Sequence, residues 1–197
     1  KKSRRALQIL KAEYLTCHSP DIYHPTPLEA LMENTGARRA QSDRKGNSGV
    51  NHSQIFSQAF DNPHEVMCHT INHLLSSIIP QLEKLGTKKT LKIALNISSS
   101  ISIREVESEI THALHEAELT HPVEFISGEG VAVINQWLNE RFTDDALLLV
   151  IALQIDPLLV NDSAEAGVAL LLGNRMTQHT LSPTGLLHRP DLDTDND

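Results

Sequence analysis

The chain has 197 residues, of which 40% are hydrophobic and 21% charged, so its composition is globular and excludes wholesale disorder. Seventeen Lys and Arg residues against 25 Asp and Glu residues give a net charge of −8, which is not the basic footprint of a general nucleic-acid-binding protein. Two cysteines and 4% aromatic residues exclude a disulfide framework, an all-cysteine metal site and an RNA-stacking platform. The length suits one domain, with or without an extra arm.

The two ends of the chain carry opposite charges. Residues 1–5 (KKSRR) contain four cations, which form either a solvated start or the basic cytosolic flank of a preceding transmembrane helix. No run in the chain approaches 18 apolar residues, so we expect a cytoplasmic chain, tethered to the inner membrane only if such a helix precedes it. Residues 191–197 alternate aspartate with small polar residues and are predicted to form a disordered acidic tail.

The first 60 residues are predicted to form an N-terminal region with an exposed basic loop. Residues 6–15 fit a strand or a short helix, and their spacing does not decide between the two. Residues 27–33 are predicted to form a short helix, and the polar, glycine-bearing stretch 33–55 is predicted to be a long loop. This loop carries four cations: Arg38, Arg39, Arg44 and Lys45. A positive patch on an acidic chain is predicted to bind an acidic protein partner, and a mobile solvated loop is the alternative.

Helices and strands alternate clearly from residue 61 onward. Asn62 and Pro63 supply the start of a helix that continues to residue 85, with apolar residues at spacings of three and four. Alternating apolar and polar residues over 91–97 predict a strand with one apolar face. Ser102 and Glu105 match a capping box and predict the start of a second helix.

The remaining elements complete an α/β pattern. A short strand over 123–126 and a glycine-bearing turn over 127–130 lead into a third helix. The nearly continuous apolar run 146–155 predicts a central strand that is buried on both faces. After a loop over 157–163, the segment AGVALLLG is predicted to be its neighbour. The order α-β-α-β-α-β-β over residues 61–190 indicates an α/β domain, with a layered mixed sheet flanked by helices.

Histidines and cysteines are the first candidates for chemistry. On the first helix, His64 and Cys68 are four residues apart, as are His69 and His73, and such pairs share a helix face and could bind zinc. Neither pair has a third or fourth ligand nearby in the sequence, so we expect no metal. A second histidine cluster, over 112–116, does not match a zinc-protease motif and is predicted to be a solvated helix face.

Nucleophile and phosphate motifs do not occur in the sequence. There is no Gly-x-Ser-x-Gly elbow and no Gly-x-x-x-x-Gly-Lys-Ser/Thr loop. The turn over 127–130 (SGEG) opens a helix, where an anion could bind, but Glu129 places a negative charge there. We therefore predict no catalytic residues and no cofactor.

The last hundred residues resemble a known fold. The buried run 146–155, the loop after it and the small-residue segment Ser163–Gly173 are similar to one half of the thiolase-like fold of β-ketoacyl synthases. In that fold a buried strand is followed by a small-residue segment that leads into an antiparallel strand. The resemblance implies a reactive cysteine at a helix N-terminus and two histidines in glycine-rich loops. Here Cys68 falls inside a predicted helix and Cys17 lies outside the similar half, so the resemblance is to a thiolase-like domain without catalytic residues.

The chain also resembles the adaptor proteins of bacterial type VI secretion loci, which are encoded beside lipase effectors and their immunity proteins. Four features carry this resemblance: the segment Arg4–Leu15, the strand 146–155, the run Ser163–Gly167 and the ending Gly185–Pro190. It implies a non-enzymatic domain that binds a toxin effector, or its immunity protein, and presents it to the secretion machinery. The alternatives are a divergent acyl-transfer enzyme that uses Cys17 or Cys68, a histidine-metal hydrolase and a membrane-tethered structural component.

Overall fold

The computed structural model describes residues 5–16, 37–39, 51–54, 62–85, 89–128, 130–155, 165–178 and 180–188. The elements in chain order are β1 (Ala6–Thr16), β2 (Ala37–Arg39), β3 (Asn51–Gln54), α2 (Pro63–Lys84), β4 (Thr90–Ser99), α3 (Ile103–Glu116), β5 (Val123–Ile126), α4 (Gly130–Asn139), β6 (Ala146–Ile155), β7 (Ala166–Gly173) and β8 (Gly185–His188). From α2 to β7 this order confirms the α-β-α-β-α-β-β pattern predicted from the sequence. None of the described helices is long and apolar enough to cross a bilayer.

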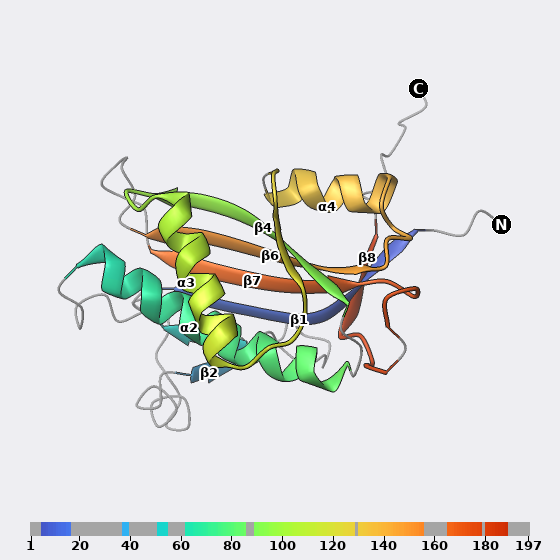
Figure 1. Cartoon of the computed structure of the whole chain (residues 1–197), viewed down its shortest axis with the longest axis horizontal. Helices are drawn as coiled ribbons and strands as arrows, with labels where there is room; N and C mark the ends of the chain where they lie inside the picture. The colour runs from blue at the N-terminus through green and yellow to red at the C-terminus, as the bar shows by residue number, and fades with distance from the viewer. Residues whose placement is uncertain are drawn as a thin grey trace.

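The described strands form one mixed sheet (Figure 1). Its eight strands run in the order β2-β3-β1-β7-β6-β4-β5, and β8 pairs with the start of β1. β4 is parallel to both β5 and β6, whereas β7 is antiparallel to both β6 and β1. The first 60 residues therefore contribute strands to the same sheet as the rest of the chain. Pairing with β7 makes 6–16 a strand, which settles the choice that its own spacing left open.

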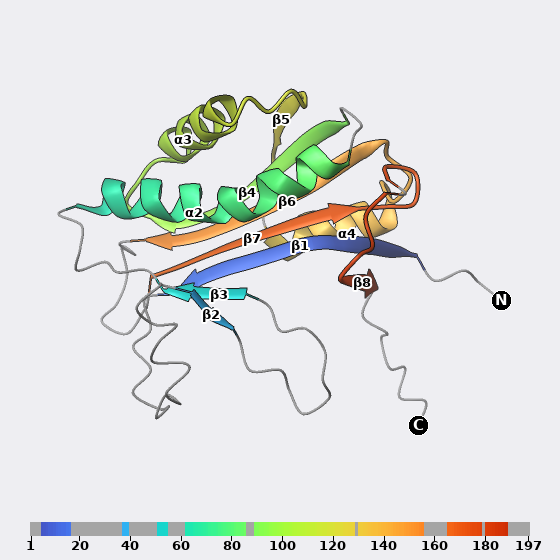
Figure 2. The ribbon, with the colours of Figure 1, turned by 90° about the horizontal axis from the view of Figure 1, so that it is seen from below.

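Helices cover both faces of the sheet, as Figure 2 shows, with α2 and α3 on one face and α4 on the other. Successive side chains of a strand point to opposite faces, so β6 supplies both cores. Leu147, Leu149 and Ile151 pack with α2 and α3, and Leu148 and Val150 pack with α4. The predicted burial of residues 146–155 on both faces is confirmed. The predicted fold class, a layered mixed sheet flanked by helices, is also confirmed.

Local capping fixes where two helices begin. The Glu65 N–H donates to the Asn62 side chain at 3.0 Å, with Pro63 in the first turn of α2. At α3 the Glu105 N–H donates to Ser102 Oγ at 3.3 Å, and the Ser102 N–H donates to Glu105 Oε2 at 3.0 Å. Both helix starts predicted from the sequence are therefore confirmed, and the second places α3 directly after β4.

The structure corrects two sequence predictions. The stretch 33–55 is not a loop throughout: residues 37–39 form β2, which is antiparallel to β3 (51–54), and β3 is parallel to β1. Strands near a sheet edge are stabilised mainly by backbone hydrogen bonds. Their sequences therefore need no alternation of apolar and polar residues, which is the pattern from which a strand is predicted. The strand at 91–97 has two covered faces, because Ala94 is buried on the α4 side. The predicted helix over 27–33 and the tail over 191–197 lie outside the described residues.

Candidate functional site

A pocket with a volume of about 350 Å³ lies at the carboxyl ends of β4 and β5. Its lining consists of Leu95, Asn96, Ile97, Ile101, Ile103, Glu107, Phe125, Ile126, Ser127 and Gly128. These residues come from the two strand ends, the first turns of α3 and the turn that leads into α4. In open α/β sheets this edge is where ligands commonly bind.

The pocket follows from the chain topology. After β4 the chain forms α3 on one face of the sheet, and after β5 it forms α4 on the opposite face. The two connections therefore diverge and leave a crevice between them. Gly128 shapes the turn: its φ of +128° is rarely open to other residues, and a Cβ there would lie 2.5 Å from Cγ2 of Val133. A side chain at position 128 would therefore disturb the start of α4.

Apolar residues are the most numerous in the described pocket lining, although polar atoms contribute at least as much of its accessible surface as apolar atoms. Ile103 is 50% exposed, and among the described residues of the lining Glu107 is the one that carries a charge. Ser127 and Asn96 provide polar groups, and the lining residues that the structure describes include no histidine or cysteine. A pocket of this kind can bind a partner's apolar side chain that lies beside a cationic or hydrogen-bonding group of the same partner.

Sequence reasoning reached only one part of this pocket. The turn over 127–130 was predicted to precede a helix, and Ser127 and Gly128 of that turn line the pocket, while Glu129 lies outside the described residues. Asn96, Ile103 and Glu107 were not singled out as site residues. The signal that could have found them is positional, because the ends of two adjacent parallel strands meet at one edge of a sheet.

Cys68 lies elsewhere, in the second turn of α2, with its Sγ atom 3.6 Å from Nε2 of His64. This contact confirms that the two side chains share a helix face. Burial raises the pKa of the Cys68 thiol to about 11, and the negative charge of Glu109 acts in the same direction. Cys68 is therefore a neutral thiol at neutral pH. Cys17 lies outside the described residues.

The other predicted histidine clusters remain apart from the pocket. The ring centroids of His69 and His73 are 6.5 Å apart, and burial, together with His69, lowers the pKa of His73. His112 and Glu116 are exposed on α3, as expected for a solvated helix face. Within the part of the chain that the structure describes, no group of three or more His, Cys, Asp or Glu side chains could hold a metal ion.

Two of the four predicted partner-binding cations belong to a strand at the other edge of the sheet. Arg38 and Arg39 belong to β2, which is the last strand at one edge, whereas the pocket adjoins β5 at the opposite edge. Arg44 and Lys45 fall outside the described residues. Strand β2, with Arg38 and Arg39, and the pocket therefore lie at opposite edges of the sheet.

No protein-family model and no curated protein matches this sequence. Among solved structures, the chain is similar to the HMG synthase of the curacin biosynthetic pathway, whose crystal structure is a complex with a holo donor-ACP. The sequence identity is 16% and the TM-score is 0.43, over 87% of this chain and 42% of that chain. The chain therefore spans less than half the length of that synthase.

Proposed function

We propose that this chain is a non-enzymatic protein-binding domain that acts as an adaptor for a toxin effector in a bacterial type VI secretion system. The observation that carries the proposal is the pocket at the carboxyl ends of β4 and β5, whose described lining presents apolar side chains, the Asn96 amide, the Ser127 hydroxyl and the Glu107 carboxylate. General acid–base or nucleophilic catalysis commonly uses a histidine, an activated thiol or hydroxyl, or a paired carboxylate, and the described lining offers only the Ser127 hydroxyl and the Glu107 carboxylate. A pocket lined in this way is suited to holding a partner's side chain.

The arrangement of the central strands supports the part of the proposal that rests on the thiolase-like resemblance. That resemblance implies an antiparallel strand after the buried central strand, and β7 is antiparallel to β6 over seven residue pairs from Leu148–Leu172 to Gln154–Ala166. Acyl transfer in that family depends on an activated cysteine at a helix N-terminus. The thiol of Cys68 has its pKa raised to about 11, the opposite of activation. These two features favour an adaptor built on an enzyme-like fold over an acyl-transfer enzyme.

The adaptor's partner is proposed to be the lipase effector or its immunity protein, both encoded beside the adaptors that the chain resembles. Its acidic surface would contact the segment that begins with Arg38 and Arg39 on β2 and continues to Arg44 and Lys45. Cations in an acidic protein accelerate association with an acidic partner more than they strengthen the final complex.

The test is co-purification with the products of the neighbouring genes, followed by light scattering of the eluted complex. We expect a stable complex with one of these products, and the same complex for the double variant Cys17→Ser, Cys68→Ser. A parallel incubation with acyl-coenzyme A is followed by mass spectrometry of the intact chain, and we expect no added mass. An acyl adduct on either cysteine, or loss of the complex in the folded double variant, would contradict the proposal and favour acyl transfer.

A further inference from the structure

Strand β5 lies at one edge of the sheet, beside the pocket. Among the described strands only β4 pairs with it, and Figure 2 shows it at the outer side of β4. The N–H of Leu91 in β4 donates to the backbone oxygen of Pro122 at 2.7 Å. Leu91 is opposite Val123, and in a parallel pair alternate residues direct their backbone groups to the same neighbour. The N–H and C=O groups of Val123 and Phe125 therefore point away from β4, and we call them the outer edge of β5.

The side chains of β5 connect this outer edge to the pocket. Phe125 lines the pocket and packs against the core between the sheet and the α2–α3 layer. Val123, two positions earlier, points to the same face of the sheet and is 40% exposed. Ile126 and Ser127, at the carboxyl end of the strand, complete this side of the lining. A segment that runs along the outer edge would therefore place alternate side chains beside Val123 and at the mouth of the pocket.

The elements around the outer edge are acidic. From the start of α3 to the end of β5, residues 103–126 contain six glutamates against one arginine and no lysine. Glu107 is half-buried in the pocket, and the described lining contains no lysine, arginine or histidine beside it. The carboxylate of Glu124, on β5 itself, lies 3.7 Å from Nζ of Lys92. A segment that carries lysine or arginine is therefore attracted to this edge, and an acidic segment is repelled.

The charge and the backbone groups together select the occupant. A two-fold contact along β5 would bring the same strand of two copies together, with the glutamates of one copy near those of the other. Such a contact between like charges disfavours a second copy of this chain. A helical partner would leave the outward groups of Val123 and Phe125 unused, because the backbone bonds of a helix are internal. An extended partner segment can pair with all of them.

We propose that an extended, basic segment of the effector or immunity protein adds a strand to the outer edge of β5. An apolar side chain of the segment enters the pocket, and a lysine or arginine two positions away, on the same face, pairs with Glu107. Backbone bonds to Val123 and Phe125 hold the segment, while the pocket and Glu107 select its sequence. This mode of binding rests on the adaptor function proposed above, and it uses a different part of the partner from the acidic surface proposed to contact Arg38 and Arg39.

Hydrogen exchange of the full chain, followed residue by residue by NMR, tests the added strand. The probe is the acetylated peptide Ser-Thr-Leu-Thr-Lys-Thr-Ser, in which leucine and lysine share one face of a strand. In the free chain we expect fast exchange at the Val123 and Phe125 amides and slow exchange at those of Glu124 and Ile126, which point to β4. The peptide at millimolar concentration should slow exchange at Val123 and Phe125 about tenfold. A peptide with glutamate in place of lysine should bind at least about tenfold more weakly.

Two variants with matched controls test the edge and the pocket in the complex with the partner. Val123→Pro removes an outward N–H but no bond to β4, and Val123→Thr is its control, since threonine keeps this N–H. Glu107→Lys reverses the charge in the pocket, and Glu116→Lys makes the same change on α3 outside the lining. We expect Val123→Pro and Glu107→Lys each to weaken the complex at least about tenfold, and both controls to bind like the parent chain. Thermal melting checks that each variant is folded, and Glu107→Lys decides if Val123→Pro unfolds.

Three results would overturn the inference. The first is a complex with a neighbouring gene product that the folded variants leave intact and in which Val123 and Phe125 still exchange fast. The adaptor function would then stand without this mode of binding. The second is equal protection by the lysine and glutamate peptides. The third is a dimer in sedimentation velocity that Val123→Pro abolishes, which would assign the edge to a second copy. Protection by the lysine peptide alone, in a chain that binds no neighbouring gene product, would support the strand-binding edge and contradict the adaptor function.

Discussion

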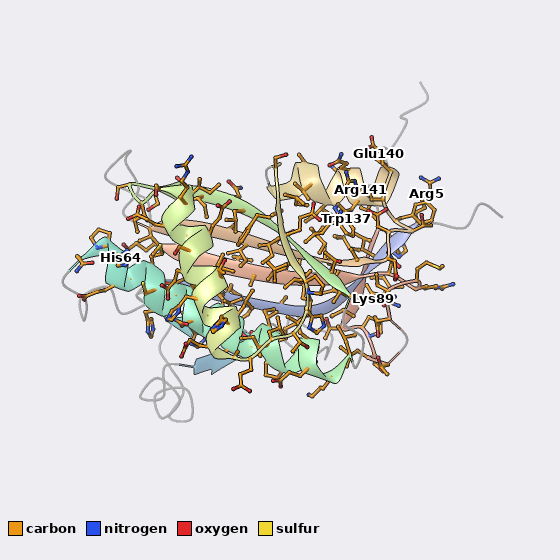
Figure 3. The ribbon with its side chains drawn as sticks, viewed as in Figure 1. Arg5, His64, Lys89, Trp137, Glu140 and Arg141 are labelled. Atoms are coloured by element: carbon orange, nitrogen blue, oxygen red, sulfur yellow. The ribbon has the colours of Figure 1, made fainter. Side chains whose placement is uncertain are left out.

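The guanidinium group of Arg5 donates a hydrogen bond from Nη1 to the backbone oxygen of Asn139 at 2.7 Å, although the two residues are 134 positions apart in the sequence. Asn139 is the last residue of α4, where unpaired carbonyl groups and the helix dipole favour a positive charge. The same guanidinium lies over the Phe142 ring, 4.3 Å from its centroid. Arg5 therefore connects the start of β1 to the segment between α4 and β6 (Figure 3).

Removal of this contact should weaken the fold modestly. We expect Arg5→Ala to lower the free energy of unfolding by about 1 kcal/mol, because a charge-assisted hydrogen bond and a cation–π contact are lost at an exposed site. Urea denaturation measures the change. Arg104→Ala is the control, since Arg104 is exposed on α3. Equal effects of the two substitutions would mean that the contact with Asn139 contributes nothing.

The interior of the sheet is tested at β6. Leu149 is fully buried between the sheet and the α2–α3 layer. We expect Leu149→Ala to destabilise the chain by about 2–4 kcal/mol, because the removed methyl groups leave a cavity. Leu186→Ala, at a residue of β8 that is 53% exposed, should change stability far less. A change of less than about 0.5 kcal/mol for Leu149→Ala would contradict the placement of β6 at the centre of the sheet.

The reactivity of Cys68 can be measured by alkylation in a Cys17→Ser background. Because the pKa of the Cys68 thiol is raised to about 11, its thiolate fraction at pH 7.5 is about a hundredfold below that of an ordinary cysteine. We expect slow reaction with iodoacetamide in the folded chain, a rate that rises with pH toward 11, and fast reaction once urea unfolds the chain. Glu109→Gln should accelerate alkylation of the folded chain, since it removes a negative charge that opposes the thiolate. Rapid alkylation at neutral pH would contradict the raised pKa of the thiol and would make Cys68 a candidate nucleophile again.

Glu13 is a carboxylate buried in the sheet, with a 3% exposed side chain on β1. Burial raises its pKa above the usual value of 4.5, although Lys11 and the Ser77 side chain act in the opposite direction. A raised pKa in the folded state means that the favourable contribution of the protonated form is complete below pH 4.5 and is lost as the pH rises through the folded value. We therefore expect Glu13→Gln to stabilise the chain by about 1 kcal/mol at pH 7.

The pH dependence separates this effect from packing. The gain from Glu13→Gln should shrink toward zero near pH 4, where the native side chain is itself protonated. Urea denaturation at both pH values measures it, with the exposed Glu83→Gln on α2 as the control. A Glu13→Gln variant that is less stable than the parent at pH 7 would show that the ionised carboxylate has better partners than its burial suggests.

The proposed partner surface is tested by charge reversal. Replacing Arg38, Arg39 and Arg44 with glutamate should slow association with the effector or immunity protein by about tenfold at low salt and flatten its salt dependence. The melting temperature should stay nearly unchanged. Ile103→Glu, at the mouth of the pocket, is the comparison variant. If the reversal has no effect and Ile103→Glu slows association or weakens the complex, the partner binds at the pocket edge of the sheet instead.

Much of the fold could be predicted from short segments. Asn62 and Ser102 begin their helices through bonds to residues three positions ahead, so the information lies within one turn. The run from Ala146 to Ile155 is apolar at almost every position, as a strand with two covered faces requires. The helix starts depend on local hydrogen bonds, and the central strand depends on the number of its covered faces. A short stretch of consecutive residues is enough to predict each of these features.

The site and the sheet edges depended on tertiary structure. Residues 6–16 became a strand because β7, at least 150 positions away, offers them backbone partners. Strands β2 and β3 formed beside that strand although their sequences lack apolar alternation. The pocket brings Asn96 of β4, Glu107 of α3 and Ser127 together only because two parallel strands end at one edge and their helices leave on opposite faces. The burial of Glu13 likewise arises from α2 packing over β1. Contacts between distant segments depend on chain topology, and a periodic pattern within one segment contains no information about which other segment will lie against it.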